Sequence, residues 1–219
     1  MNITYEQVRQ SEEIRTYITQ ADQSLVARGF TEHSFAHVTR CAEYAARILD
    51  KLGYGEHDQE LARIAGFMHD IGNVVNRHDN AQTGAVMAFR ILDKMGMEPA
   101  DVAAVITAIG HHDDPTAYPV NPVAAALILA DKTDVRSSRV RNKDMATFDI
   151  HDRVNYAVTR SELNIVPDRE IGLDLTIDTE ISTVMDYFEI FLGRMVLCRK
   201  AAEKLGVHFS LTINGQKMM

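Results

Sequence analysis

The chain has 219 residues, 46% of them hydrophobic, and a formal net charge of −8 at pH 7. This length can bury a core in one domain with a small addition, and the negative charge argues against binding to a nucleic-acid polymer, which depends on Lys and Arg that neutralise phosphates. Cys41 and Cys198 are too few and too far apart in sequence for a disulfide framework, which favours a reduced compartment.

No membrane segment is expected from the sequence. No apolar run approaches about 18 residues, and the chain does not begin with a basic-then-apolar leader. We therefore expect a cytoplasmic protein that has no membrane partner.

The first two-thirds of the sequence show helical periodicity. Residues 5–28 form one periodic segment, and Thr31 is the expected N-cap of a helix that continues to Gly53. His33 and His37 are one turn apart in this segment, so we expect both on one helical face.

The next helices are expected to carry polar side chains at their ends. Asp58 is the predicted cap of a helix that ends at His69 and Asp70, with Gly72 just beyond it. A further helix is expected over residues 80–95.

Proline suits the first position of a helix, so Pro99 and Pro122 mark two more helix starts. The first of these helices reaches the adjacent pair His111 and His112. The second is very apolar and delivers Asp131 on its last turns.

The pattern changes after about residue 145. Residues 154–166 and 170–178 are rich in β-branched residues and flank a Pro-Asp turn, which predicts a hairpin. A helix over 180–205 and a strand over 207–213 follow.

These elements predict a mainly α fold in two parts. Residues 1–145 are expected to form a helical metal-binding domain, and residues 146–219 a small antiparallel α+β appendage of the order strand, strand, helix, strand, packed on it.

Seven residues of metal-binding types occur in a suggestive order along the chain. They are His37, His69, Asp70, His78, His111, His112 and Asp131. Imidazoles and carboxylates suit divalent transition metals, and this set can fill the coordination spheres of two ions. One Asp can bridge both ions while a metal-bound water is deprotonated to attack phosphorus.

The strings His-Asp-Ile-Gly at 69–72 and Ala-Asp-Lys-Thr-Asp at 130–134, preceded by His37, resemble the HD-domain superfamily of metal-dependent phosphohydrolases over about residues 30–140. The resemblance implies a helical HD-domain bundle and two divalent ions, with iron or manganese as candidates. It implies two ligand sets: His37, His69, Asp70 and Asp131 for the first ion, and Asp70, His78, His111 and His112 for the second.

Other residues are candidates for catalysis and substrate binding. Beside Asp70, His33 is a candidate proton donor to the leaving group, or it simply covers the helix surface. Arg136, Arg139 and Arg141 form a basic run that suits phosphate, although such a run is also typical of a solvated face or of an interface with carboxylates.

The expected activity is the hydrolysis of a phosphomonoester, or of a phosphodiester or nucleotide bond, by a metal-bound hydroxide. The expected partner is a small phosphorylated substrate, with nucleotides among the candidates, and a homodimer is left open. Two alternatives remain, because HD-fold mixed-valent di-iron oxygenases use nearly the same ligands and a non-catalytic metal-stabilised sensor or assembly module would also keep them.

Overall fold

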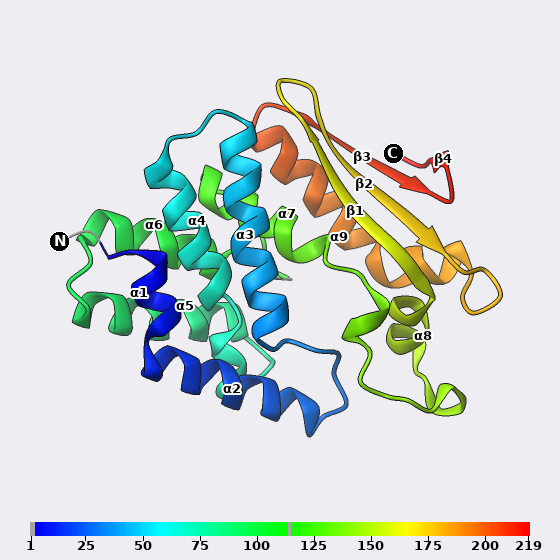
Figure 1. Ribbon diagram of the computed structural model, residues 1–219, viewed down its shortest axis with the longest axis horizontal. Coiled ribbons are helices and arrows are strands. Elements are labelled where there is room, and N and C mark those ends of the chain that lie inside the picture. The colour runs from blue at the N-terminus through cyan, green and yellow to red at the C-terminus, as the bar shows by residue number, and fades with distance from the viewer. Residues whose placement is uncertain (1–2, 114) are drawn as a thin grey trace.

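The computed structural model describes residues 3–113 and 115–219. Figure 1 shows a helical bundle at the N-terminal side and a small sheet at the C-terminal side of the molecule. The helices of the bundle are α1 (Tyr5–Gln10), α2 (Glu12–Val26), α3 (Phe35–Lys51), α4 (Glu56–Met68), α5 (Asn80–Lys94), α6 (Pro99–Gly110) and α7 (Pro122–Lys132), with a short 3-10 helix, η1 (Ile71–Val74), after α4. None of the described helices combines the length and apolar character that crossing a bilayer requires.

The start of α3 differs from the sequence expectation. Its N-cap is Ser34, whose hydroxyl accepts a hydrogen bond from the backbone N–H of Ala36, and not Thr31. His33 therefore precedes the helix, and the prediction that it shares a helical face with His37 is wrong.

Other helix boundaries follow local capping. The segment expected over residues 5–28 is divided at Ser11, which ends α1 and caps α2. The N-cap of α4 is Gly55 rather than Asp58. The expected starts at Pro99 and Pro122 are confirmed.

Helices α3 and α4 approach each other closely at a glycine. A Cβ atom added at Gly66 of α4 would lie 2.6 Å from the Cα of Ala42 in α3, which is too close for any real contact. Only a residue without a side chain allows this separation. The close approach brings the start of α3 alongside the end of α4, where His37 and His69 lie.

The C-terminal part is mixed α and β. Its elements are two 3-10 helices, η2 (Ser137–Arg139) and η3 (Met145–Thr147), then α8 (Ile150–Ala157), β1 (Val158–Val166), β2 (Glu170–Ile177), α9 (Val184–Lys204), β3 (His208–Ile213) and β4 (Gln216–Lys217). The strand order is β1-β2-β3-β4, and the expected order strand, strand, helix, strand is present in β1, β2, α9 and β3. Helix α9 packs against α7 and against strands β2 and β3.

Two sequence expectations for this part need correction. Residues 154–157 belong to α8 and not to a strand, because Asp149 caps that helix by accepting a hydrogen bond from the backbone N–H of Asp152 at 2.7 Å. The expected antiparallel pairing holds for β1 with β2 and for β3 with β4, but β2 and β3 are parallel because α9 joins them as a crossover.

Candidate metal centre

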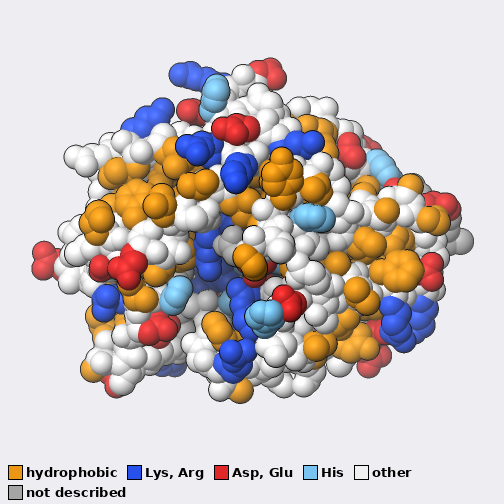
Figure 2. Space-filling view, turned by 180° about the vertical axis from the view of Figure 1, so that it is seen from behind, with side chains coloured by type: hydrophobic (Ala, Val, Ile, Leu, Met, Phe, Trp, Pro, Cys, Tyr) orange, Lys and Arg blue, Asp and Glu red, His pale blue; other side chains and the backbone are white. Residues whose placement is uncertain are grey.

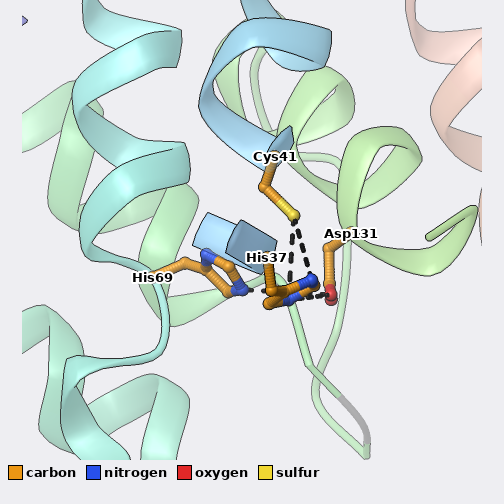
Figure 3. A group of neighbouring side chains, drawn as sticks. All are labelled: His37, Cys41, His69 and Asp131. Carbon is orange, nitrogen blue, oxygen red and sulfur yellow. Dashed lines mark hydrogen bonds and ion pairs between the residues drawn. The ribbon is translucent and has the colours of Figure 1, made fainter. Parts of the chain in front are cut away.

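The structure brings together four of the predicted metal ligands. His37 lies on the first turn of α3, His69 and Asp70 follow the end of α4, and Asp131 lies on the last turn of α7. Nε2 of His37 is 3.3 Å from Oδ1 of Asp131 and 3.6 Å from Oδ2 of Asp70, and Nε2 of His69 is 3.2 Å from Oδ2 of Asp70. Figure 3 shows His37, His69 and Asp131 pointing toward one another.

Neighbouring groups fix the orientation of these side chains. Nδ1 of His37 lies 2.8 Å from Oδ2 of Asp134, and Nδ1 of His69 lies 2.7 Å from the carbonyl oxygen of Gly66. In each ring Nδ1 therefore donates, so Nε2 is the nitrogen that faces the cluster and that holds the lone pair when the ring is neutral. Asp134 is thus placed to orient a metal ligand.

Two buried atoms in this cluster have no hydrogen bond. They are Nε2 of His69 and Oδ2 of Asp70. The other carboxylate oxygen of Asp70 accepts a hydrogen bond from Nδ2 of Asn73 at 2.8 Å, so only Oδ2 is left over. A buried polar atom without a hydrogen bond costs free energy, and these two atoms, 3.2 Å apart, fit a divalent cation that binds both once the proton of His69 has left.

The spacing of the donor atoms also fits a metal ion. Donors about 2.1 Å from one ion, in a tetrahedral or octahedral arrangement, lie about 3.0–3.4 Å apart. The closest contacts among His37, His69, Asp70 and Asp131 are 3.2, 3.3 and 3.6 Å. These four side chains therefore fit one divalent cation with little rearrangement.

The charges of the cluster depend on one another. Burial alone would raise the pKa of Asp70 and Asp131, but His69 beside Asp70 and Lys132 beside Asp131 hold both pKa values well below the usual range. Burial would lower the pKa of His69, but Asp70 and Asp131 outweigh it and raise that pKa to about 9. In the metal-free protein His69 carries the proton that a metal ion would have to displace.

Cys41 joins the cluster although it was not among the predicted ligands. Its Sγ lies 3.7 Å from both ring nitrogens of His37, one helical turn earlier on α3. His37, Cys41, His69 and Asp131 have donor atoms within 4.8 Å of one another (Figure 3). Burial raises the pKa of the Cys41 thiol well above its ordinary value, so without a metal it is a neutral neighbour. The i, i+4 spacing to His37 was the signal that could have identified it.

Of the three histidines expected at a second metal, the structure places only His112 in the cluster. Its ring is buried 4.9 Å from that of His69, centroid to centroid, and its Nδ1 lies 2.6 Å from the carbonyl oxygen of Ile109. A ligand atom of His112 lies within 4.8 Å of those of His69 and Asp70.

His111 and His78 are not brought to the cluster. Nδ1 of His111 lies 2.9 Å from the carbonyl oxygen of Thr107, and this residue is in neither group of clustered donor atoms among the described residues. The side chain of His78 is 84% exposed and pairs with Asp79 in the loop before α5. The arrangement thus does not form the expected second ligand set of Asp70, His78, His111 and His112.

His33 lies beside the cluster despite its position before α3. Its ring centroid is 5.5 Å from that of His37, and its Nδ1 lies 2.7 Å from the carbonyl oxygen of Thr31. Burial lowers the pKa of His33 to about 3, although Asp70 opposes this shift. The ring is therefore neutral at pH 7 and offers Nε2 as a hydrogen-bond acceptor.

The basic run after α7 makes mostly structural contacts. Arg136 pairs with Asp134 and Glu32, and Arg141 pairs with Asp22. Only Arg139 of the three lines the cavity described below, and its guanidinium donates to backbone carbonyl oxygens of residues 32 and 134. The geometry supports the interface interpretation of this run for Arg136 and Arg141.

A cavity of ≈ 310 Å³ opens beside the cluster. His33, Asp70, His112 and Asp131 line it on the bundle side, and α8 and α9 contribute the facing wall. Its cationic lining residues are Arg28, Arg77, Lys132, Arg139 and Arg194. The face seen in Figure 2 is hollowed near its middle, and Lys and Arg side chains gather in the hollow.

Asp113 forms ion pairs with two of these cations, Lys132 and Arg77. It lies 2.6 Å from Nζ of Lys132 and 3.3 Å from a terminal nitrogen of Arg77, and Nζ of Lys132 is also 2.8 Å from Oδ2 of Asp131. Burial would raise the pKa of Asp113, but Lys132 holds it well below its usual range. Asp131 is thus connected through Lys132 and Asp113 to the cavity wall.

Comparison with known proteins agrees with this site. Residues 34–136 match the model of the HD domain family. Over 111 residues the chain is 33% identical to ribonuclease Y of Deinococcus radiodurans, a match that covers 49% of this chain and 18% of that protein's length.

A solved structure, described as a predicted HD superfamily hydrolase from an uncultured Thermotogales bacterium, is 27% identical in sequence with a TM-score of 0.44. That match covers 57% of this chain and 68% of the other. The family match contains His37, His69, Asp70 and Asp131, the four side chains that meet in the cluster. Residues 34–136 of the chain therefore carry an HD domain.

Proposed function

We propose that this protein is a metal-dependent phosphohydrolase that acts on a small phosphate ester. The observation that carries the proposal is the pair of buried atoms without hydrogen bonds, Nε2 of His69 and Oδ2 of Asp70, next to His37 and Asp131. They lie beside a cavity whose lining includes Lys and Arg side chains as well as Asp113, Asp149 and Asp152. Imidazole nitrogens and carboxylate oxygens are ligands for a metal ion, and the Lys and Arg side chains favour an anionic substrate.

In this proposal His37, His69, Asp70 and Asp131 hold one divalent ion, with iron or manganese as our candidates. Such an ion supplies Lewis acidity and makes a coordinated water acidic near neutral pH. The placement of His78 and His111 favours one ion over the two that the sequence suggested. His112 stands beside Asp70 as a further donor.

The chain's own groups have distinct tasks in the proposed reaction. Asp134 and the carbonyl oxygen of Gly66 hold the two histidine rings with Nε2 toward the cluster. Neutral His33 presents Nε2 as an acceptor, so it is suited to hold and orient an attacking water. This replaces the proton-donor role suggested by the sequence.

The cavity supports a small substrate. Its volume of ≈ 310 Å³ is at the lower end of the range for small-molecule sites, about 300–1,000 Å³. A nucleotide or a phosphorylated metabolite of similar size suits such a cavity better than a polymer does. The di-iron oxygenase alternative is less favoured, because its ligand pattern requires His78 and His111 in the cluster.

The test is a metal-substitution screen. The protein is purified without O₂, stripped by a chelator, reloaded with Mn²⁺ or Fe²⁺, and assayed on phosphomonoesters, phosphodiesters and nucleotides. We expect Mn²⁺ to support turnover of at least one phosphoester without O₂, because hydrolysis needs no electron transfer. Activity only with iron and O₂ would identify an oxygenase, and no turnover with any metal would favour the non-catalytic module.

A further inference from the structure

Arg194 stands in the cavity wall opposite the metal cluster, although it lies outside the HD domain. It belongs to α9 (Val184–Lys204), the helix that links β2 to β3 and packs against α7. Its guanidinium carbon lies 4.8 Å from the ring centroid of Phe191, one turn earlier, and both side chains line the cavity. Stacking on an aromatic ring holds a guanidinium in place while leaving its N–H groups free to donate.

Arg194 differs from the other cations of the cavity in what it contacts. Arg77 and Lys132 pair with Asp113, and Arg139 donates to backbone carbonyls. Arg28 also stacks on an aromatic ring, that of Phe30, but it donates a long hydrogen bond of 3.5 Å to Oδ1 of Asn76. Within residues 3–113 and 115–219, the guanidinium of Arg194 makes no hydrogen bond or ion pair, only the contact with Phe191.

The partly buried, unpaired guanidinium of Arg194 costs free energy unless an anion binds it. The side chain is only partly exposed, and burial lowers its pKa while Asp131 and Asp113 act in the opposite direction. A partly buried guanidinium with five donors and no acceptor retains a desolvation cost that an anion would remove. Asp131 is also a metal ligand in the proposed function, so the charge of Arg194 acts next to the reacting group.

We propose that Arg194 binds a phosphate oxygen of the substrate, so that α9 supplies a substrate-binding residue to the metal centre of the HD domain. The inference rests on the proposed function for the chemical class of the ligand. Arg77 and Lys132 line the same cavity and add positive charge there while they remain paired with Asp113. The planar guanidinium of Arg194, stacked on the Phe191 ring, can make a bidentate contact with phosphate.

The experiment uses inorganic phosphate as the probe and the full-length, Mn²⁺-loaded protein. Binding is measured by calorimetry for the wild type, for Arg194→Ala and Arg194→Lys, and for Arg199→Ala as a control on the exposed side of the same helix. Metal content and thermal unfolding are measured for each variant to show that all are folded and loaded.

We expect Arg194→Ala to weaken phosphate binding by about 10- to 100-fold, as loss of a charge-assisted contact does. Arg194→Lys should recover only part of the affinity, because an ammonium cannot make the bidentate contact. Arg199→Ala should bind like the wild type. Metal content should be equal in all four proteins.

Two results of the binding measurements would overturn the inference. One is phosphate affinity in Arg194→Ala within about two-fold of the wild type, and the other is wild-type binding of acetate as tight as that of phosphate, which would mean a carboxylate site. If Arg194→Ala fails to fold, Arg194→Lys is used in its place. Phosphate affinity of Arg194→Lys within about two-fold of the wild type would then overturn the inference.

The outcome separates this inference from the proposed function. Phosphate binding that depends on Arg194, in a protein that hydrolyses no phosphoester, would retain the anion site and reject the hydrolase. A phosphoester substrate whose KM and kcat do not change in Arg194→Ala would retain the hydrolase and reject the role of Arg194.

Discussion

Oδ2 of Asp134 lies 2.8 Å from Nδ1 of His37, and this contact decides which nitrogen of the ring faces the metal cluster. Arg40 and Arg136 approach the other oxygen, Oδ1, at 3.0 and 2.9 Å. The carboxylate is thus held on both sides, and His37 has little freedom to rotate.

Replacing Asp134 should therefore weaken metal binding although it is not itself a ligand. We expect Asp134→Asn to lower metal affinity by roughly 10- to 100-fold, because the neutral amide holds the imidazole less firmly. A competition assay with a chromophoric chelator measures this. Asp101→Asn is the matched control, since Asp101 pairs with His57 at 2.9 Å on the surface, and it should bind metal like the wild type. An unchanged affinity in Asp134→Asn would contradict the orienting role.

The ligand assignment predicts opposite results for Asp70 and His78, both of which the sequence proposed as metal ligands. Asp70→Ala should remove nearly all bound metal, because it deletes a buried oxygen of the cluster, whereas His78→Ala should retain the wild-type amount. Elemental analysis of the purified proteins measures both. Equal metal in wild type and Asp70→Ala would refute the site, and loss of metal in His78→Ala would mean that the loop before α5 closes on the ion.

His33 is predicted to act on the attacking water and not on the leaving group. We expect His33→Ala to keep its metal and to lose roughly 10²-fold in kcat, because the attacking water is no longer held in position. The loss should be similar for nitrophenyl and alkyl phosphates, because a ring with a pKa of about 3 is already deprotonated and does not donate to the leaving oxygen. A much smaller loss on nitrophenyl substrates would restore the proton-donor role. His57→Ala serves as the control on the surface.

Metal binding should depend on pH through His69. Its pKa of about 9 in the metal-free protein means that the ion displaces a proton at pH 7.5, so affinity should rise with pH until about pH 9. Because the folded pKa lies above the ordinary value of about 6.5, the protonated ring stabilises the metal-free fold fully below about pH 6.5, and this stabilisation is lost as the pH rises through about 9. Calorimetry in two buffers of different ionisation enthalpy should show about one proton released per ion. Release of no proton would contradict the raised pKa.

The close approach of α3 and α4 predicts a stability effect at Gly66. A Cβ there would collide with backbone atoms of residues 41 and 42, so Gly66→Ala should lower the free energy of unfolding by about 1–3 kcal/mol and weaken metal binding by separating His37 from His69. Gly193→Ala is the matched control in helix α9, where the added methyl meets nothing within 4 Å. It should stabilise by about 0.5–1 kcal/mol. Denaturant unfolding measures both, and a neutral Gly66→Ala would contradict the packing.

The sequence could predict the parts of the site that local patterns encode. His37, His69, Asp70 and Asp131 were predicted because ligand types and spacing along helices are visible in one chain. Helix starts at Pro99 and Pro122 followed from the fixed backbone angle of proline.

The remainder depended on contacts between distant segments. Arg77 and Arg194 meet in one cavity only after the chain has folded, and no local pattern marks either of them. His78 has a metal-binding side chain in a plausible order, but the loop that carries it turns the ring to solvent. The basic run suggested phosphate binding, yet the neighbouring Asp134 and two distant residues, Asp22 and Glu32, neutralise much of it.

Part of the cavity wall lies outside the HD domain, and this arrangement matters for how such a protein can evolve. The cluster residues lie within residues 34–136, whereas α8 and α9 form the facing wall and follow that stretch. Substitutions in α8 or α9 can therefore change the shape and charge presented to a ligand without altering a single cluster side chain. Selection can act on ligand preference through one segment while the other preserves the metal chemistry.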